Sequence, residues 1–93
     1  MQKVFQVYTD PQHGWIKVPR KLLTKLGIAD KISSCSYMRG NYVYLEEDSD
    51  ADKFFKAYKE HTGHEPEQRL HWTNRSSKIR NYFSYSPTGY ASW

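Results

Sequence analysis

Apolar side chains recur along this chain with two different spacings. Trp15, Ile16 and Val18 form a strand-like run that ends at Pro19, whose fixed φ suits the start of a helix. A three- and four-residue spacing follows, which predicts one amphipathic helix of about two turns. The residues of this helix that carry the signal are Leu22, Leu23 and Leu26, with Gly27 at the expected end.

A hairpin is predicted after that helix. Arg39-Gly40-Asn41 is a glycine-containing turn, and strand-forming residues flank it on both sides. Those residues are Tyr37 before the turn and Tyr42, Tyr44 and Leu45 after it.

The next segment predicts a second helix and a further strand. Asp48, Ser49 and Asp50 offer a cap and negative charge at the start of the helix, and Gly63 closes it. One face of the helix is apolar, with Ala51, Phe54, Phe55 and Tyr58, and we expect this helix to cover a small sheet. From Gln68 to Thr73 apolar and polar residues alternate, as in a half-buried strand with Leu70 and Trp72 on one side and Arg69 and His71 on the other.

These elements predict an α+β fold, a small and mostly antiparallel sheet with two helices in the order β-β-α-β-β-α-β. At 93 residues the chain is expected to be a single domain. Its parts are the paired strands and short helix of 1–47, the helix and strand of 48–73, and a basic, aromatic segment of 74–93. The expected core residues are Trp15, Ile16, Val18, Leu22, Leu26, Ile28, Val43, Leu45, Phe54, Phe55 and Tyr58.

The order of elements over residues 7–47 resembles the AbrB/SpoVT family of swapped-hairpin DNA-binding proteins. The matching anchors are Gly14, Val18-Pro19, Leu22, Leu26-Gly27-Ile28 and Val43-Tyr44-Leu45. The resemblance implies an interleaved homodimer built from residues 3–47, since one copy of this half offers few strands to cover its apolar face. It also implies transcription regulation through DNA binding.

The basic positions of that family are largely replaced in this chain. Where the family commonly carries arginine, this sequence has Tyr8, Trp15, Leu23 and Thr24. Nearby cations remain at Arg20, Lys21 and Lys25, and they are candidates for a shifted DNA-contact surface.

Charge is distributed unevenly along the chain. Residues 1–47 carry seven cations and four anions, residues 48–67 three and six, and residues 68–93 four and none, which add up to the net charge of +4. In the last segment the cations are interleaved with the rings of Tyr82, Phe83, Tyr85, Tyr90 and Trp93. Cations neutralise phosphates and aromatic rings stack on unpaired bases, so this mixture favours a nucleic-acid surface. It also suits packing on the domain with solvated cations, or docking on an acidic protein surface.

The predicted nucleic-acid or partner contacts are Arg69, Trp72, Arg75, Lys78, Arg80 and Tyr82 in the last segment, with Arg20, Lys21 and Lys25 in the first. We expect Arg75, Lys78 and Arg80 to be free to bind phosphate, because no carboxylate lies near them in the sequence.

Enzymatic and metal-binding functions find little support in the sequence. His61 and His64 form one loose pair of ligand type, with Cys35 or His71 as a third, whereas structural zinc sites usually show two tight pairs. His13 is interpreted as a turn residue, and the acidic run after Leu45 as a strand that leads into a helix cap. No nucleophile motif or glycine-rich phosphate loop occurs, so we predict no enzyme, no metal and no cofactor.

The sequence therefore predicts a small, non-enzymatic, dimeric nucleic-acid-binding regulator, with DNA favoured over RNA. The alternative is a protein-binding accessory or inhibitor from a phage or mobile element that blocks a host defence complex. A single cysteine, Cys35, and the absence of a signal-peptide pattern or a long apolar run favour a cytoplasmic location without membrane attachment.

Overall fold

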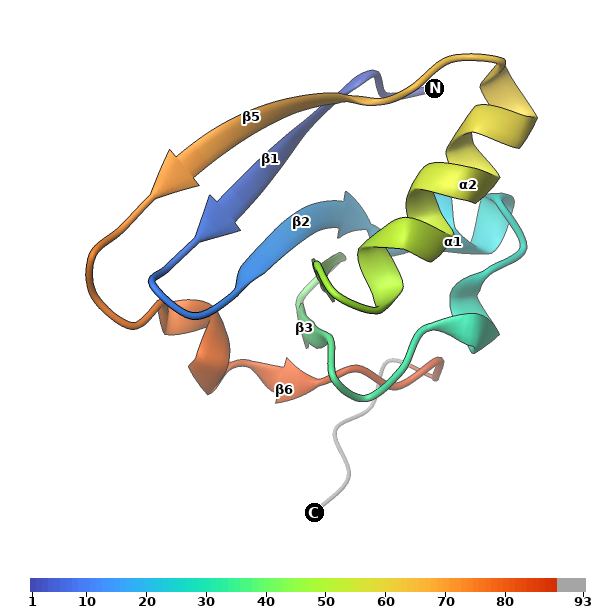
Figure 1. Ribbon diagram of the computed structural model, residues 1–93. Coiled ribbons are helices and arrows are strands. Elements are labelled where there is room, and N and C mark those ends of the chain that lie inside the picture. Colours follow the sequence, from blue (N-terminus) through green and yellow to red (C-terminus); the bar gives the residue numbers. More distant parts are fainter. Residues whose placement is uncertain (89–93) are drawn as a thin grey trace.

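One six-stranded sheet joins the three predicted parts of the chain in the computed structural model, which describes residues 1–88 (Figure 1). The strands lie in the spatial order β5-β1-β2-β4-β3-β6. Their bounds are β1 (Val4–Thr9), β2 (Gly14–Pro19), β3 (Tyr37–Arg39), β4 (Tyr42–Glu46), β5 (Glu67–Trp72) and β6 (Phe83–Ser84). Every neighbouring pair is antiparallel except β1 and β5, which run parallel.

Two α-helices and two short 3₁₀ helices connect these strands. They are α1 (Arg20–Lys25), η1 (Ala29–Lys31), α2 (Asp50–Thr62) and η2 (Lys78–Asn81). The predicted α+β fold and its order of seven elements are confirmed, and β6 adds an eighth element at the edge of the sheet. A strand of two residues is too short to show a period, which explains why the pattern of apolar residues did not predict it.

Left-handed glycines stand where turns were predicted. Gly27 follows α1 with φ of 73°, and Gly40 lies in the turn between β3 and β4 with φ of 58°. A side chain at either position would be strained, because L-residues rarely adopt positive φ. The end of the first helix and the hairpin turn are therefore confirmed.

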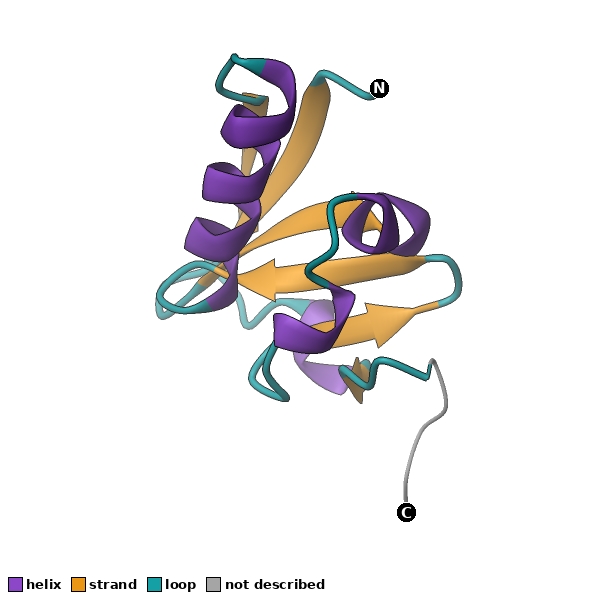
Figure 2. Cartoon of the chain, turned by 90° about the vertical axis from the view of Figure 1, so that its right-hand side faces the viewer, coloured by secondary structure: helices purple, strands orange, loops and turns teal. Residues whose placement is uncertain are grey.

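The main core lies between the sheet and the two α-helices. In Figure 2, α2 runs along one side of the strands. Phe5 on β1 makes edge contacts with the rings of Phe54 and Tyr58 on α2, with ring centroids 5.0 and 5.6 Å apart. Leu22 and Leu23 of α1 are buried in the same cluster. The predicted covering role of the second helix is confirmed.

Two members of the predicted core are only partly buried. Leu26 and Phe55 pack against the core from its margin, whereas Leu23 and Phe54 are fully buried. The three-four spacing does not decide which of two neighbouring apolar residues is fully buried, because in a helix as short as α1 it does not fix which side faces the sheet. The core also contains buried residues that were not predicted as core: Phe5, Val7, Leu23, Ile32, Met38, Ala51 and Tyr85.

A second, smaller cluster lies on the opposite face of the sheet. Trp15, Tyr44 and Ile79 are buried there, with Tyr8, Tyr37 and Tyr82 packed around them. Trp15 was predicted to be a core residue and is 2% exposed, yet it belongs to this second cluster. The sheet is thus covered on both faces near its centre, by helices on one side and by residues 77–82 on the other.

Both hairpins close within one chain. β2 pairs with β4 in a register that runs from Trp15 opposite Glu46 to Pro19 opposite Tyr42. Within this chain, α1 and α2 cover the apolar face formed by these strands. Within residues 1–88, neither helix has the length and apolar character that crossing a membrane requires.

Candidate nucleic-acid interface

Side chains paired directly across neighbouring strands point to the same face of a sheet. Tyr8 pairs with Trp15 and with His71, and Lys17 pairs with Tyr44. These residues all point away from α2. We call this surface the tyrosine face, and it further includes Gln6, Pro19, Arg39, Tyr42 and Arg69 by the same registers.

A groove crosses the tyrosine face beside η2. It is lined by Tyr8, Lys17, Tyr44, Ser77, Lys78, Ile79 and Tyr82, and its volume is about 170 Å³. We call it the tyrosine groove. Its lining holds three phenol rings and two lysines and no carboxylate.

Aromatic rings form a continuous path along this face. The Tyr8 ring stacks on the His71 imidazole at 5.1 Å between centroids, with an angle of 21° between the planes. Tyr8 also approaches Tyr44 at 6.4 Å, and Tyr44 approaches Tyr82 at 5.0 Å. His71 is exposed, and Tyr8 and Tyr82 are half-buried, so these three rings have free surface.

Burial gives the central tyrosine a chemical role different from that of its neighbours. Tyr44 is 8% exposed, and burial together with the adjacent hydroxyls of Tyr82 and Tyr8 raises its pKa to about 12. Tyr44 is therefore uncharged at physiological pH and forms the buried base of the groove. The rings that a ligand can reach are those of the neighbouring residues.

Four cations in the groove or on the tyrosine face form no ion pair with a carboxylate among residues 1–88. Lys17 lies 4.2 Å from the centroid of the Tyr42 ring, and the Arg39 guanidinium carbon lies 5.1 Å from that of Tyr82. Arg69 and Lys78 are exposed and form no ion pair within the described chain. Glu67 and Glu46 stand at opposite ends of the tyrosine face, so its centre is positively charged.

The Arg80 guanidinium forms an ion pair with a carboxylate of the same chain. Its guanidinium donates from Nε to Oδ2 of Asp10 at 2.9 Å and from Nη2 to Oδ1 at 3.0 Å. The same guanidinium lies 5.2 Å from the centroid of the Trp15 ring. The expectation that Arg80 is free for a ligand does not match this geometry, because its carboxylate comes from a residue distant in the sequence.

Asp10 is the anchor for the segment that forms the groove. Its carboxylate also accepts backbone N–H groups from Gln12, His13 and Ser77 at 2.9 to 3.0 Å. The hydrogen bonds from Arg80 contribute most to holding the pKa of Asp10 far below its usual range, against the opposing effect of burial. Asp10 therefore fixes both the turn after β1 and the start of η2.

The other predicted contact residues are spread over different surfaces. Arg20 donates to the Ser86 carbonyl and to the Met38 sulfur, both at 3.0 Å, so its guanidinium is bound within the chain. Lys21 and Lys25 are exposed on α1, and Lys21 lines a separate cavity with Pro19 and Tyr42 at the margin of the tyrosine face. The structure therefore brings Lys78 and Tyr82 together in one groove, with Arg69 on the same face of the sheet, and no residue of α1 lines that groove.

Two further residues of the predicted set do not line the groove. Arg75 is exposed in the loop after β5. Trp72 pairs with Thr9 and points to the α2 side. Tyr90 and Trp93 of the aromatic run lie outside the described residues.

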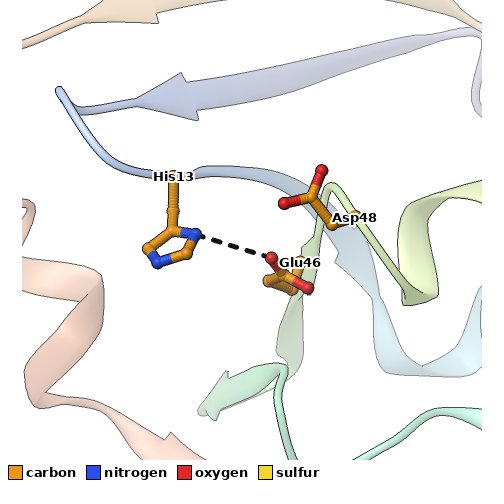
Figure 3. A group of neighbouring side chains, drawn as sticks. All are labelled: His13, Glu46 and Asp48. Carbon is orange, nitrogen blue, oxygen red and sulfur yellow. Dashed lines mark ion pairs between the residues drawn. The ribbon is translucent and has the colours of Figure 1, made fainter.

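Among the described residues, one group has donor atoms close enough to be considered for a metal ion (Figure 3). His13, Glu46 and Asp48 place ligand-type atoms within 4.8 Å of one another. The His13 Nδ1 lies 3.6 Å from the Glu46 carboxylate, which also accepts a hydrogen bond from Ser49. This local pairing accounts for Glu46, and Asp48 is exposed.

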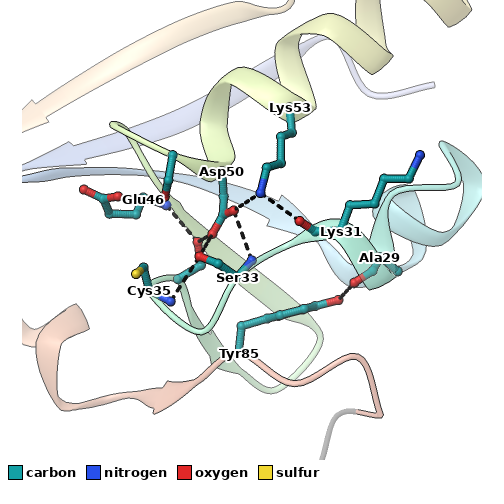
Figure 4. Close-up of polar contacts among 10 residues, drawn as sticks. Ala29, Lys31, Ser33, Cys35, Glu46, Asp50, Lys53 and Tyr85 are labelled. Carbon is teal, nitrogen blue, oxygen red and sulfur yellow. Dashed lines mark hydrogen bonds and ion pairs between the residues drawn. The ribbon is translucent and has the colours of Figure 1, made fainter.

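A second buried carboxylate serves the fold rather than a ligand (Figure 4). Asp50 is fully buried at the start of α2, where it accepts from the backbone and hydroxyl of Ser33, from Ser36 and from Lys53. Burial opposes the charge, but these hydrogen bonds hold the pKa of Asp50 below its usual value. Asp50 ties α2 to the loop before β3, whereas Ser49 at the cap position makes no capping bond.

The groove contains residues that sequence reasoning did not select. Lys17 was not singled out, and Tyr8 was named only as a position where the AbrB/SpoVT family commonly carries arginine. Arg39, beside the groove, was interpreted only as a turn residue. Their alternation with the buried Ile16, Val18 and Val7 was the available signal, since period two places them on the face opposite the core. Local spacing does not show that residues 77–82 pack against that face.

Comparisons with models of protein families, with curated proteins and with solved structures find no match for this chain.

Proposed function

We propose that this protein is a nucleic-acid-binding regulator that holds a single strand across its tyrosine face. The observation that carries the proposal is the combination, on one face of the sheet, of a path of accessible rings and four cations that have no carboxylate partner within residues 1–88. Cations bind backbone phosphates, and rings stack on bases that are not paired, so the combination suits a single strand.

The arrangement favours a single strand over a duplex for a geometric reason. Tyr8, Tyr82 and His71 offer ring surface within a shallow sheet face, and stacking on a base is worth about 1 to 3 kcal/mol per base. A duplex keeps its bases stacked on one another and presents chiefly phosphates. We expect DNA and RNA single strands both to bind, since phosphate contacts and stacking do not require a particular sugar.

A titration of the purified protein into fluorescein-labelled oligothymidylate tests the proposal through fluorescence anisotropy. The test variant is Lys17→Ala/Lys78→Ala, which removes two cations that line the groove. We expect weaker binding and a salt dependence that flattens by about 1.4 in the log-log slope, or about 0.7 for each lost phosphate contact.

The matched control is Lys56→Ala/Lys59→Ala, which removes the same net charge from α2. These lysines are exposed and pair with Asp52 and Glu65 on the opposite side of the molecule. An equal loss of affinity in both double variants would show that binding follows net charge alone. If the parent protein binds neither single strands nor duplexes, the alternative of a module for an acidic protein surface replaces this proposal.

A further inference from the structure

β5 is an edge strand whose outer side is open. Glu67 and Thr73 donate their backbone N–H groups to the carbonyls of Lys3 and Thr9, at 2.9 and 3.0 Å. Backbone groups of alternate residues in a strand point to opposite edges, so those of Gln68, Leu70 and Trp72 point away from the sheet. Figure 1 shows β5 at the margin, with no helix beyond it.

The residues with outward backbone groups also carry the exposed apolar surface. Leu70 is 72% exposed and Trp72 is 67% exposed, and both point to the α2 side of the sheet by their pairing with Val7 and Thr9. The sequence pattern predicted that this side of the strand is buried, and that expectation is wrong for the single chain, because α2 does not reach over β5. Soluble proteins usually protect such an edge with lysine, proline or a bulge.

We propose that β5 is the dimer interface, with the β5 strand of a second copy added antiparallel to it. The sequence around β5 is nearly self-complementary when it is paired about His71. Leu70 then lies opposite Trp72 of the second copy, and Trp72 lies opposite its Leu70. In the same register Arg69 lies opposite Thr73, the residue that follows β5.

In this register the outward backbone groups form hydrogen bonds and the apolar side chains are covered. Leu70 and Trp72 both have outward N–H and C=O groups, so each of the two symmetric pairs exchanges two hydrogen bonds. The four apolar side chains fall on one face of the joined sheet and cover one another. The contact is isologous, and a two-fold axis that passes between the His71 residues closes it as a dimer.

The dimer also places both tyrosine faces on the same side of the joined sheet, because the two-fold axis is perpendicular to it. The interface nevertheless does not rest on nucleic-acid binding, since it follows from the open edge and its apolar residues alone.

Light scattering after gel filtration, over protein concentrations up to about 1 mM, tests the association. We expect the mass of the parent to rise from 11.1 kDa toward twice that value with concentration. Leu70→Pro removes an outward N–H without touching the bonds from β5 to β1, and Leu70→Thr/Trp72→Thr keeps the backbone but removes the apolar pair. Both should remain at the monomer mass with unchanged circular dichroism.

Phe83→Thr is the matched control. Phe83 is 50% exposed on β6, at the opposite edge of the sheet, and its replacement should leave the dimer intact. A parent that stays at the monomer mass throughout, or a dimer that survives both β5 variants, would overturn the proposed interface.

Cysteine cross-linking tests the register in a Cys35→Ser background, which removes the exposed native thiol. His71→Cys places two thiols opposite each other across the two-fold axis, at a separation that a disulfide can span. Arg69→Cys places them several residues apart. We expect rapid oxidation to a covalent dimer for the first variant only, and preferential cross-linking of the second would refute the pairing about His71.

Discussion

The Arg80 guanidinium and the Asp10 carboxylate form a bidentate ion pair across 70 residues of sequence, with N–O distances of 2.9 and 3.0 Å. Arg80 thereby holds residues 77–82 against the sheet, where Ile79 is buried beside Trp15. The tyrosine groove exists only while this segment is docked, because Ser77, Lys78, Ile79 and Tyr82 form one of its walls. Arg80 was predicted to contact a ligand, but in the structure it holds the segment that forms the groove.

Asp10→Asn should destabilise the fold by about 1 to 3 kcal/mol at pH 7, because an amide cannot accept all the hydrogen bonds that the buried carboxylate accepts. Urea unfolding followed by circular dichroism measures the change. Asp48→Asn is the control, since Asp48 is an exposed carboxylate close to the same edge of the sheet. Equal stability of the Asp10→Asn variant and the parent would contradict the anchoring role of Asp10.

The Asp10 carboxylate should also make the stability of the fold depend on pH in the acidic range. The pKa of Asp10 is lowered in the folded state, so its contribution is complete above the unfolded value of about 3.9 and is lost as pH falls toward the folded value. We expect the melting temperature of the parent to fall more steeply than that of Asp10→Asn between about pH 4 and pH 2. Asp50, whose pKa is also lowered, should leave a smaller acid dependence in the variant. Parallel curves would show that Asp10 is not charged in the fold.

Tyr44 should give the opposite dependence at high pH. Its pKa is raised to about 12 in the folded state, so the folded protein keeps a proton that the unfolded chain loses near pH 10. Stability should therefore decline as pH rises from about 10 to 12, and this decline should be smaller in Tyr44→Phe. Thermal melts across this range compare the two proteins, and ultraviolet titration should show one fewer late-ionising phenol in the variant.

Two adjacent phenylalanines on α2 should respond differently to truncation. Phe54→Ala removes a fully buried ring in contact with Phe5 and Tyr58, so it should cost about 3 to 5 kcal/mol. Phe55 is only partly buried, and Phe55→Ala should cost about 1 to 2 kcal/mol. Denaturant unfolding of both variants shows which substitution costs more stability. An equal cost would mean that α2 turns both phenylalanines equally toward the sheet.

Local patterns predicted the elements of this fold because each signal lies within one turn or hairpin. The stops at Gly27 and Gly40 and the spacing of Leu22 and Leu23 depend on neighbours a few residues away. The pairing of Asp10 with Arg80 joins opposite ends of the chain, and no local spacing reports it. A single sequence therefore defines strands and helices better than it defines which cation meets which carboxylate.

In the candidate site, too, local patterns predicted some residues and long-range contacts determined the others. Tyr82 and Lys78 were predicted as contacts from the mixture of rings and cations, and they do line the groove. Lys17 and Tyr8 form its other wall, and their role depends on the sheet order, which places β1 and β2 beneath η2. Trp72 was predicted as a contact together with these residues, but its register with Thr9 places it on the other face of the sheet.

The parallel pairing of β1 with β5 has a consequence for synthesis on the ribosome. β1 emerges early and can pair with β2 at once, but its other edge waits for residues 67–72, with the whole of α2 in between. Until then the nascent chain exposes the open edge of β1 as a template for other strands. The edge of β1 is therefore covered only after residues 67–72 have been synthesised and β5 pairs with it.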